Sequence, residues 1–220
     1  MSLGSGRGNG HVTPCEACPL RKRDSLRPFT PEELAFVQDF KTDELRVEPG
    51  ASFLREGMRS EHLYTVLSGW AFRYKMLDDG RRQILNYALP ADMVGLQGAL
   101  MREMEHSVEA LTPLTLCVFP RQKMWDLYSR VPTLAFDITW LAAREEQLVD
   151  EHLLSVGRRS ALERTAYLLL HLYVRAEEAG LVRDNSIQFP FTQQHLADTL
   201  GMSLVHTNKT LKRLLASNAV

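Results

Sequence analysis

Three cysteines are the residues of this 220-residue chain with the strongest potential for metal or redox chemistry. Cys15 and Cys18 are separated by two residues near the N-terminus, and Cys117 lies within an apolar run. Thiolates are good ligands for zinc and for iron–sulfur clusters, and a Cys-x-x-Cys pair also supports redox exchange. Cys117 alone is equally consistent with a small buried hydrophobic residue. The cysteines therefore leave three interpretations open: a metal or cluster site, a thiol switch, and no bound metal.

Residues 191–215 carry the pattern of two short helices joined by a glycine turn. Thr192 and Ser203 are good N-caps, and Gly201 stands where a chain leaving the first helix can adopt a positive φ. Apolar or small residues repeat at helical spacing on one face of each helix. They are Leu196, Ala197 and Leu200 in the first helix and Thr207, Leu211, Leu214 and Leu215 in the second. This pattern predicts a helix-turn-helix, whose second helix commonly reads the DNA major groove.

The opposite face of the second helix carries side chains suited to DNA. Val205, Asn208 and Lys209 stand at i, i+3 and i+4 and therefore share one face. They are suited, in that order, to a thymine methyl group, an adenine edge, and a guanine or phosphate. Ser203 and Lys212 are better placed for phosphates. The predicted DNA-binding residues are Ser203, Val205, His206, Asn208, Lys209 and Lys212.

Composition and charge narrow the class of protein. The chain is 45% hydrophobic and 24% charged, as is ordinary for a soluble globular protein, and its net charge of −1 gives no general affinity for nucleic acid. From residue 192 onward, however, Lys209, Lys212 and Arg213 face Asp198 alone, which gives a small positive end. No apolar run has the length of a membrane span. Three cysteines are too few for a disulfide framework, so we expect a cytoplasmic protein with no membrane partner.

The first half of the chain reads as a β-barrel preceded by one short helix. Thr30 and Glu33 form a capping box at the start of that helix. Between residues 45 and 120, apolar runs alternate with turn signals, which is typical of an antiparallel sandwich or jelly roll. The predicted strands are Ser52–Arg55, His62–Leu67, Trp70–Leu77, Arg82–Ala88, Ser107–Ala110 and Leu114–Phe119. We expect Asp79 and Gly80 at a hairpin tip.

The second half reads as helical. One long helix is expected over residues 132–156, ended by Gly157. Its apolar residues alternate in steps of four and three, which favours a coiled-coil-like dimer interface over packing on the barrel of the same chain. The predicted dimerisation residues are Leu134, Ile138, Leu141 and Leu148.

A second helix follows the long one. It opens with a capping box at Ser160 and Glu163 and runs to Ala179. The residues expected on its inward face are Leu162, Ala166, Leu169, Leu170 and Tyr173. A short strand, Ser186–Phe189, then precedes the helix-turn-helix.

These elements define an α+β fold with four parts. Residues 1–28 form a flexible N-terminal segment with the Cys-x-x-Cys pair, and residues 29–131 a β-barrel sensor domain. Residues 132–157 form the long dimerisation helix, and residues 158–220 the helix-turn-helix domain.

This order of elements resembles the Crp/Fnr family of bacterial transcription regulators. The motifs that carry the resemblance are Gly69 after a strand, Asp79-Gly80 at the hairpin, Ala91-Asp-Met-Val-Gly95, and Thr192-Gln-Gln-x-Leu-Ala-x-x-Leu-Gly-x-Ser203. The resemblance implies a jelly-roll barrel related to cyclic-nucleotide-binding domains, a dimer, a winged helix-turn-helix on a palindromic DNA site, and RNA polymerase as a partner. The family's wing should follow Val220, so we expect the wing to be truncated.

The resemblance also bears on the effector. The cyclic-nucleotide branch needs an acid just after Gly95 and an arginine followed by Ser or Thr about ten residues later. Here Leu96 and Gln97 stand in the first place and His106-Ser107 in the second. Without that clamp for a cyclic phosphate, cyclic AMP is not expected to bind in the familiar manner.

The Fnr branch holds an oxygen-sensing iron–sulfur cluster on four cysteines. Cys15, Cys18 and Cys117 match three of the four places in order, and the fourth place lies near Asp24. Asp24 and His11 are the candidates for the missing ligand. The resemblance therefore implies an incomplete version of the cluster site.

The recognition helix also departs from the family. The better-known members present an acid and an arginine to DNA, where this chain has Val205 and Lys209. We therefore expect a related but altered palindrome.

Two other classes of function explain the sequence less well than a DNA-binding regulator does. A metal-dependent enzyme of the cupin type needs paired histidines on the barrel, whereas only His62 and His106 lie there and they are not paired. A cyclic-nucleotide module that regulates an attached kinase or channel does not explain the helix-turn-helix. We expect a DNA-binding regulator and no enzyme.

Overall fold

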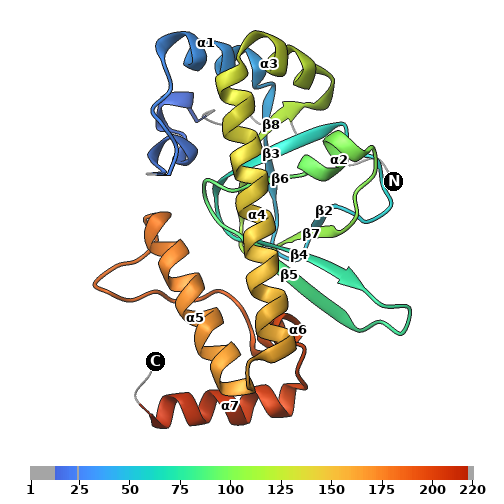
Figure 1. The fold of residues 1–220 in the computed structure, drawn as a ribbon, viewed down its shortest axis with the longest axis vertical. Helices are drawn as coiled ribbons and strands as arrows, with labels where there is room; N and C mark the ends of the chain where they lie inside the picture. The colour runs from blue at the N-terminus through green and yellow to red at the C-terminus, as the bar shows by residue number, and fades with distance from the viewer. Residues whose placement is uncertain (1–12, 24, 218–220) are drawn as a thin grey trace.

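The computed structural model describes residues 13–23 and 25–217. Two candidate metal ligands, His11 and Asp24, lie outside these residues, as do residues 1–12 of the predicted flexible segment and the last three residues of the predicted DNA-binding domain. Figure 1 shows a barrel of strands beside one long helix, with a smaller group of helices at the C-terminal end. None of the described helices has the length and apolar character needed to cross a membrane.

The barrel consists of two four-stranded antiparallel sheets, which confirms the jelly-roll prediction. One sheet has the order β1-β8-β3-β6 and the other β2-β7-β4-β5. The strands are β1 Asp43–Val47, β2 Ser52–Leu54, β3 His62–Ser68, β4 Ala71–Met76, β5 Arg82–Ala88, β6 Met93–Val94, β7 Ser107–Ala110 and β8 Leu114–Pro120. Val66, Val108 and Leu116 are fully buried between the sheets. The strands β1 and β6 were missed by the sequence prediction.

Gly69 has a steric reason to be glycine. Its φ is +88°, and a Cβ atom there would lie 2.3 Å from the backbone oxygen of Pro113. The close approach fixes the turn between β3 and β4 against the loop before β8.

Short helices close the end of the barrel that Figure 1 shows uppermost. They are α1 Pro31–Phe40, η3 Arg121–Lys123 and α3 Met124–Arg130, while η1 Cys15–Ala17 and η2 Pro19–Lys22 lie lower, beside the barrel, and α2 Leu96–Met101 lies on another side of it. The capping box at α1 is confirmed, because Thr30 Oγ1 accepts from the Glu33 N–H at 3.2 Å and Glu33 Oε2 from the Thr30 N–H at 2.8 Å.

The long helix is α4, Pro132–Arg158, which runs the length of the barrel (Figure 1). The prediction that Gly157 ends it is wrong. A glycine costs a helix only about 1 kcal/mol, and this one is followed by one more helical residue. The helix ends at Arg158, and the ψ of 144° at the following residue, Arg159, is extended and leads into the N-cap of the next helix.

The residues predicted for a dimer seam face the chain's own barrel instead. Leu134 and Ile138 are buried in a cluster with Phe40, Leu63 and other residues of the same chain. The Leu141 side chain is also buried, and Leu148 is half-buried. Leu134 and Ile138 are therefore covered within the chain, and the dimer interface predicted for these residues stays a prediction.

The C-terminal helices are α5 Ala161–Glu178, α6 Gln193–Leu200 and α7 Leu204–Ala216. The capping box at Ser160 is confirmed. Two residues expected inside are exposed, Leu170 on α5 and Leu215 on α7, and Leu172 and Thr210 are buried in their place. Among the described residues, the predicted strand Ser186–Phe189 is absent, because this segment makes only one isolated bridge, between Arg183 and Ser186.

Candidate DNA-reading helix and thiol site

The helix-turn-helix has the caps that its sequence predicts. Thr192 Oγ1 accepts from the His195 N–H at 3.3 Å, and Ser203 Oγ accepts from the His206 N–H at 3.2 Å. Gly201 lies between them with a φ of +61°. These local interactions fix where α6 begins and ends and where α7 begins.

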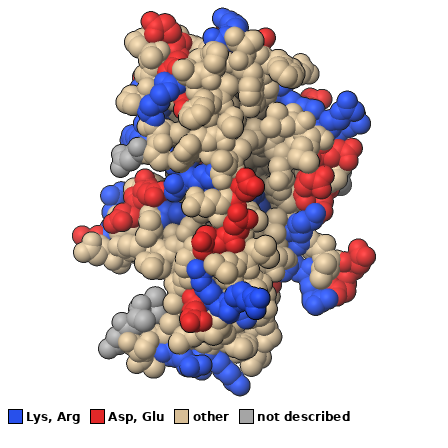
Figure 2. Space-filling view, viewed as in Figure 1, with Lys and Arg blue, Asp and Glu red and all other residues tan. Residues whose placement is uncertain are grey.

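The outward face of α7 carries the predicted DNA-binding residues. The Val205 side chain is 65% exposed, and Ser203, His206, Lys209 and Lys212 are also exposed, while Asn208 is half-buried. The opposite face packs inward through Thr207, Thr210 and Leu214. Figure 2 shows basic side chains at the end of the molecule formed by α7. The residues are thus accessible, and their individual contacts with DNA stay a prediction.

The helix-turn-helix and the barrel share one hydrophobic core. Phe72 and Tyr87 of the barrel lie in the same cluster as Leu172, Leu200 and Leu214 of the C-terminal helices. The Tyr87 hydroxyl is 2.9 Å from Thr199 Oγ1, and burial raises the pKa of that tyrosine well above its usual range. No sequence signal pointed to the contact between Tyr87 and Thr199, because these residues lie 112 positions apart.

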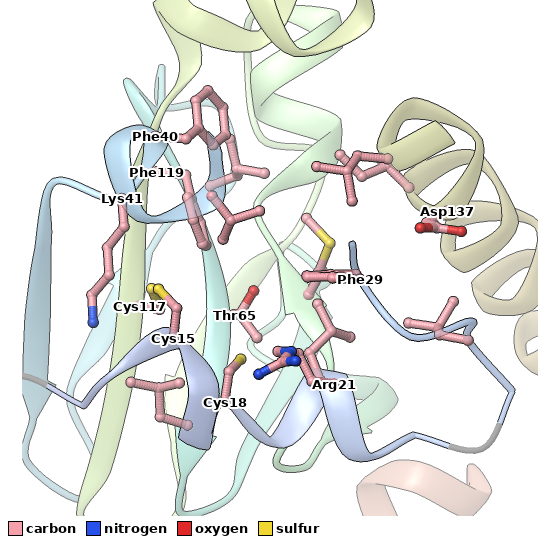
Figure 3. Close-up of a pocket in the computed structure, with 18 of the residues that line it drawn as sticks. Cys15, Cys18, Arg21, Phe29, Phe40, Lys41, Thr65, Cys117, Phe119 and Asp137 are labelled. Atoms are coloured by element: carbon pink, nitrogen blue, oxygen red, sulfur yellow. The ribbon is translucent and has the colours of Figure 1, made fainter. Parts of the chain in front are cut away.

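The three cysteines converge, as the resemblance implied. Cys15 begins η1, Cys18 precedes η2, and Cys117 lies in β8 opposite Thr65 of β3. Figure 3 shows the three side chains at one pocket beside Lys41. This pocket holds about 70 Å³ and is otherwise mainly apolar. The cysteines are free thiols in this structure.

Burial keeps the thiols protonated at neutral pH. It raises the pKa of Cys117 to about 12, and a charge on Cys15 or Cys18 would raise it further. Burial raises the pKa of Cys15 and Cys18 as well, while the Lys41 ammonium opposes this effect at all three. Because a metal must displace these protons, binding would release protons and strengthen with pH.

The spacing of the possible donors bears on which group the cysteines could hold. Among the described residues, no three His, Cys, Asp or Glu side chains are close enough together to hold a single ion. An iron–sulfur cluster spans several iron atoms and is held by more widely spaced thiolates. Cys15, Cys18 and Cys117 line the same pocket, and the place expected for a fourth ligand, Asp24, lies outside the described residues.

A second pocket, of about 480 Å³, lies between the barrel and α4. It contains Gly95, Leu96 and Gln97 on one side and His106 on another. Burial lowers the pKa of His106 to about 4, and its Nε2 atom has no hydrogen-bond partner among the described residues. The expectation that cyclic AMP does not bind here stays a prediction.

The fold and the exposed helix define a class of protein: a β-barrel joined by a long helix to a helix-turn-helix of the DNA-binding type. Comparison with known proteins agrees with this class. The family model described as "Cyclic nucleotide-binding domain" matches residues 44–131, and the one described as "Crp-like helix-turn-helix domain" matches residues 163–220.

Known relatives establish the family. The chain is 30% identical to the nitrogen fixation regulation protein FixK of Bradyrhizobium diazoefficiens, over 96% of this chain and 87% of that protein. It is 27% identical to the transcriptional activator protein FnrL of Cereibacter sphaeroides, over 91% and 81%. The solved structure of FixK2 from Bradyrhizobium japonicum matches 80% of this chain and 85% of its own, with a TM-score of 0.72 and 25% identity. The chain belongs to the Crp/Fnr family, close to its Fnr branch. It is a DNA-binding transcription regulator and not an enzyme.

Proposed function

We propose that this regulator binds a palindromic operator as a homodimer and responds to redox conditions through Cys15, Cys18 and Cys117. The observation that carries the proposal is the meeting of three thiols from two distant parts of the chain in one buried pocket. Since its target is chromosomal DNA, the proposal implies the cytoplasm as its compartment. RNA polymerase is the partner that an activator of this family would contact.

The proposed dimer uses the face of α4 turned away from the barrel. Phe136 and Leu153 are about 70% exposed there, and Leu154 is also exposed. Large apolar side chains on an exposed helix face favour a second protein surface over water. A second copy of the chain, related by a two-fold axis along α4, would place two recognition helices for two half-sites.

The proposed group at the thiol site is an iron–sulfur cluster. The residues that would hold it are Cys15, Cys18 and Cys117, with Asp24 or His11 in the fourth position. When bound, the cluster would supply a redox-sensitive link between the N-terminal segment and the barrel. The pocket's apolar lining, which includes Phe40 and Phe119, would limit access of water to it.

The test is the absorbance spectrum and the iron and sulfide content of anaerobically purified protein. We expect a broad visible band that bleaches in air, and its loss in Cys18→Ser. The matched control is Met93→Leu, which changes the same pocket without removing a thiol and should keep the band. Colourless, iron-free wild-type protein would overturn the cluster. Bound zinc would support a zinc site in its place, and a disulfide formed in air would support a thiol switch.

A further inference from the structure

One carboxylate connects the cysteine-bearing segment to the DNA-binding helices. Asp92 lies in the turn between β5 and β6 and is 5% exposed. Its Oδ1 atom accepts from Arg23 Nη2 at 2.9 Å, and its Oδ2 atom accepts from Arg175 Nη2 at 2.5 Å. Arg23 belongs to the N-terminal segment and Arg175 to α5, so two distant parts of the chain meet at this one side chain.

On the other side of Asp92, the Arg175 side chain is buried and makes two further hydrogen bonds. Its Nη1 atom donates to Asn86 Oδ1 and to the Tyr87 backbone oxygen, both at 3.0 Å. Tyr87 in turn reaches Thr199 of α6. The position of Arg175 is therefore coupled to both the barrel and the helix-turn-helix.

The Arg23 side lies next to the thiol site. Arg23 directly follows η2, which begins immediately after Cys18. Its guanidinium also donates to the backbone oxygen of Ala91 at 3.4 Å. A change at Cys18 that moves η2 would displace Arg23 and leave Asp92 bound to one arginine in place of two.

We infer that Asp92 is a positioning residue that transmits the state of the thiol site to the DNA-binding domain, through Arg23 on one side and Arg175 on the other. The part of the inference that concerns signalling rests on the proposed thiol function. The connection from Arg23 through Asp92 to Arg175 does not rest on it, because both ion pairs are present while the cysteines are free thiols. Arg23 is the position to test, since its loss leaves the buried Asp92–Arg175 pair intact.

The first experiment measures amide hydrogen exchange of Arg23→Met. We expect several-fold faster exchange in α5 around Arg175 than in wild type, because one of the two arginines bound to Asp92 is gone. The matched control is Arg59→Met, which removes an exposed arginine whose only ion pair in the described structure is with Glu103, at 3.9 Å. Equal exchange in Arg23→Met and Arg59→Met would overturn the connection, whatever the cysteines bind.

The second experiment measures operator affinity before and after air oxidation of anaerobic protein. In wild type we expect the visible band to bleach and the affinity to change. In Arg23→Met we expect the same bleaching with the change in affinity largely lost. An unchanged affinity response in Arg23→Met would overturn transmission through Asp92. A wild type with no band contradicts the proposed cluster instead, and the exchange experiment still decides the connection.

Discussion

Arg82 of β5 donates its Nε–H to Asp198 of α6 at 2.9 Å, which ties the barrel to the first helix of the helix-turn-helix. The Arg82 guanidinium also lies over the ring of Phe72, 5.0 Å from its centroid. Both charged side chains are largely shielded from water. The recognition helix α7 therefore projects from a domain that is fixed against the barrel, and its orientation depends on contacts made far from DNA.

Weakening this ion pair should loosen the DNA-binding domain. We expect Asp198→Asn to lower the free energy of unfolding by about 1 kcal/mol, because the pair is partly buried and the amide retains part of the hydrogen bonding. Urea denaturation measures this change. The control is Asp79→Asn at the exposed hairpin tip, which should leave stability unchanged. Equal stability of the two variants would contradict a role for Asp198 in docking.

Buried His106 should make the protein less stable in mild acid. Burial lowers its pKa from 6.5 to about 4, with the nearby charges of Arg73 and Lys75 acting in the same direction. Between these pH values the unfolded chain binds a proton that the folded chain does not, so the free energy of unfolding falls as pH falls below 6.5. At pH 5.5 the loss from this one group is about 1.4 kcal/mol.

The measurement is urea denaturation of wild type and His106→Leu at pH 7 and pH 5.5. The variant should lose less stability than wild type between these two values, since it lacks the titrating group. His171, whose pKa is also lowered to about 4, will leave a residual slope in both proteins. Parallel losses in the two proteins would show that His106 is not the group responsible.

A charge on the outer face of α4 should weaken the proposed dimer. The Leu153 side chain is 71% exposed on that face. In Leu153→Glu, a two-fold axis would bring two carboxylates together in place of two apolar side chains, which we expect to weaken dimerisation by about tenfold or more. Sedimentation equilibrium measures this, with Trp125→Glu on α3 as the control at an apolar residue that is even more exposed. A dimer of wild-type strength in Leu153→Glu would place the interface elsewhere.

Local signals in the sequence predicted the parts of the fold that depend on neighbouring residues. The N-caps Thr30, Ser160, Thr192 and Ser203 each bind a backbone N–H three residues away, so their pattern is visible in the sequence. Strands bounded by glycine turns were also predicted, because the turn residues stand next to the strands in the sequence. The strand β6 was missed because two residues, Met93–Val94, carry no period.

Contacts between residues far apart in the chain could not be predicted from the sequence. An apolar stripe such as that of Leu134 and Ile138 does not say whether a partner or the same chain covers it, and here the same chain does. The ion pairs of Asp92 with Arg23 and Arg175 join segments at least 69 positions apart. The meeting of the three cysteines was predicted only from the family resemblance, because no local pattern around Cys117 indicates that it lies near Cys15.

The recognition helix offers a prediction that separates base reading from phosphate binding. We expect Asn208→Ala to relax specificity at one base step by about 1–3 kcal/mol, because Asn208 is suited to pair with an adenine edge. Lys212→Ala, on the same exposed side of α7, should instead weaken binding to all sequences alike and reduce its salt dependence. Binding of both variants to a library of randomised half-sites makes the comparison. Uniform weakening by Asn208→Ala would mean that Asn208 contacts the DNA backbone. If wild type selected the half-site of the better-known family members, the altered palindrome expected from Val205 and Lys209 would be contradicted.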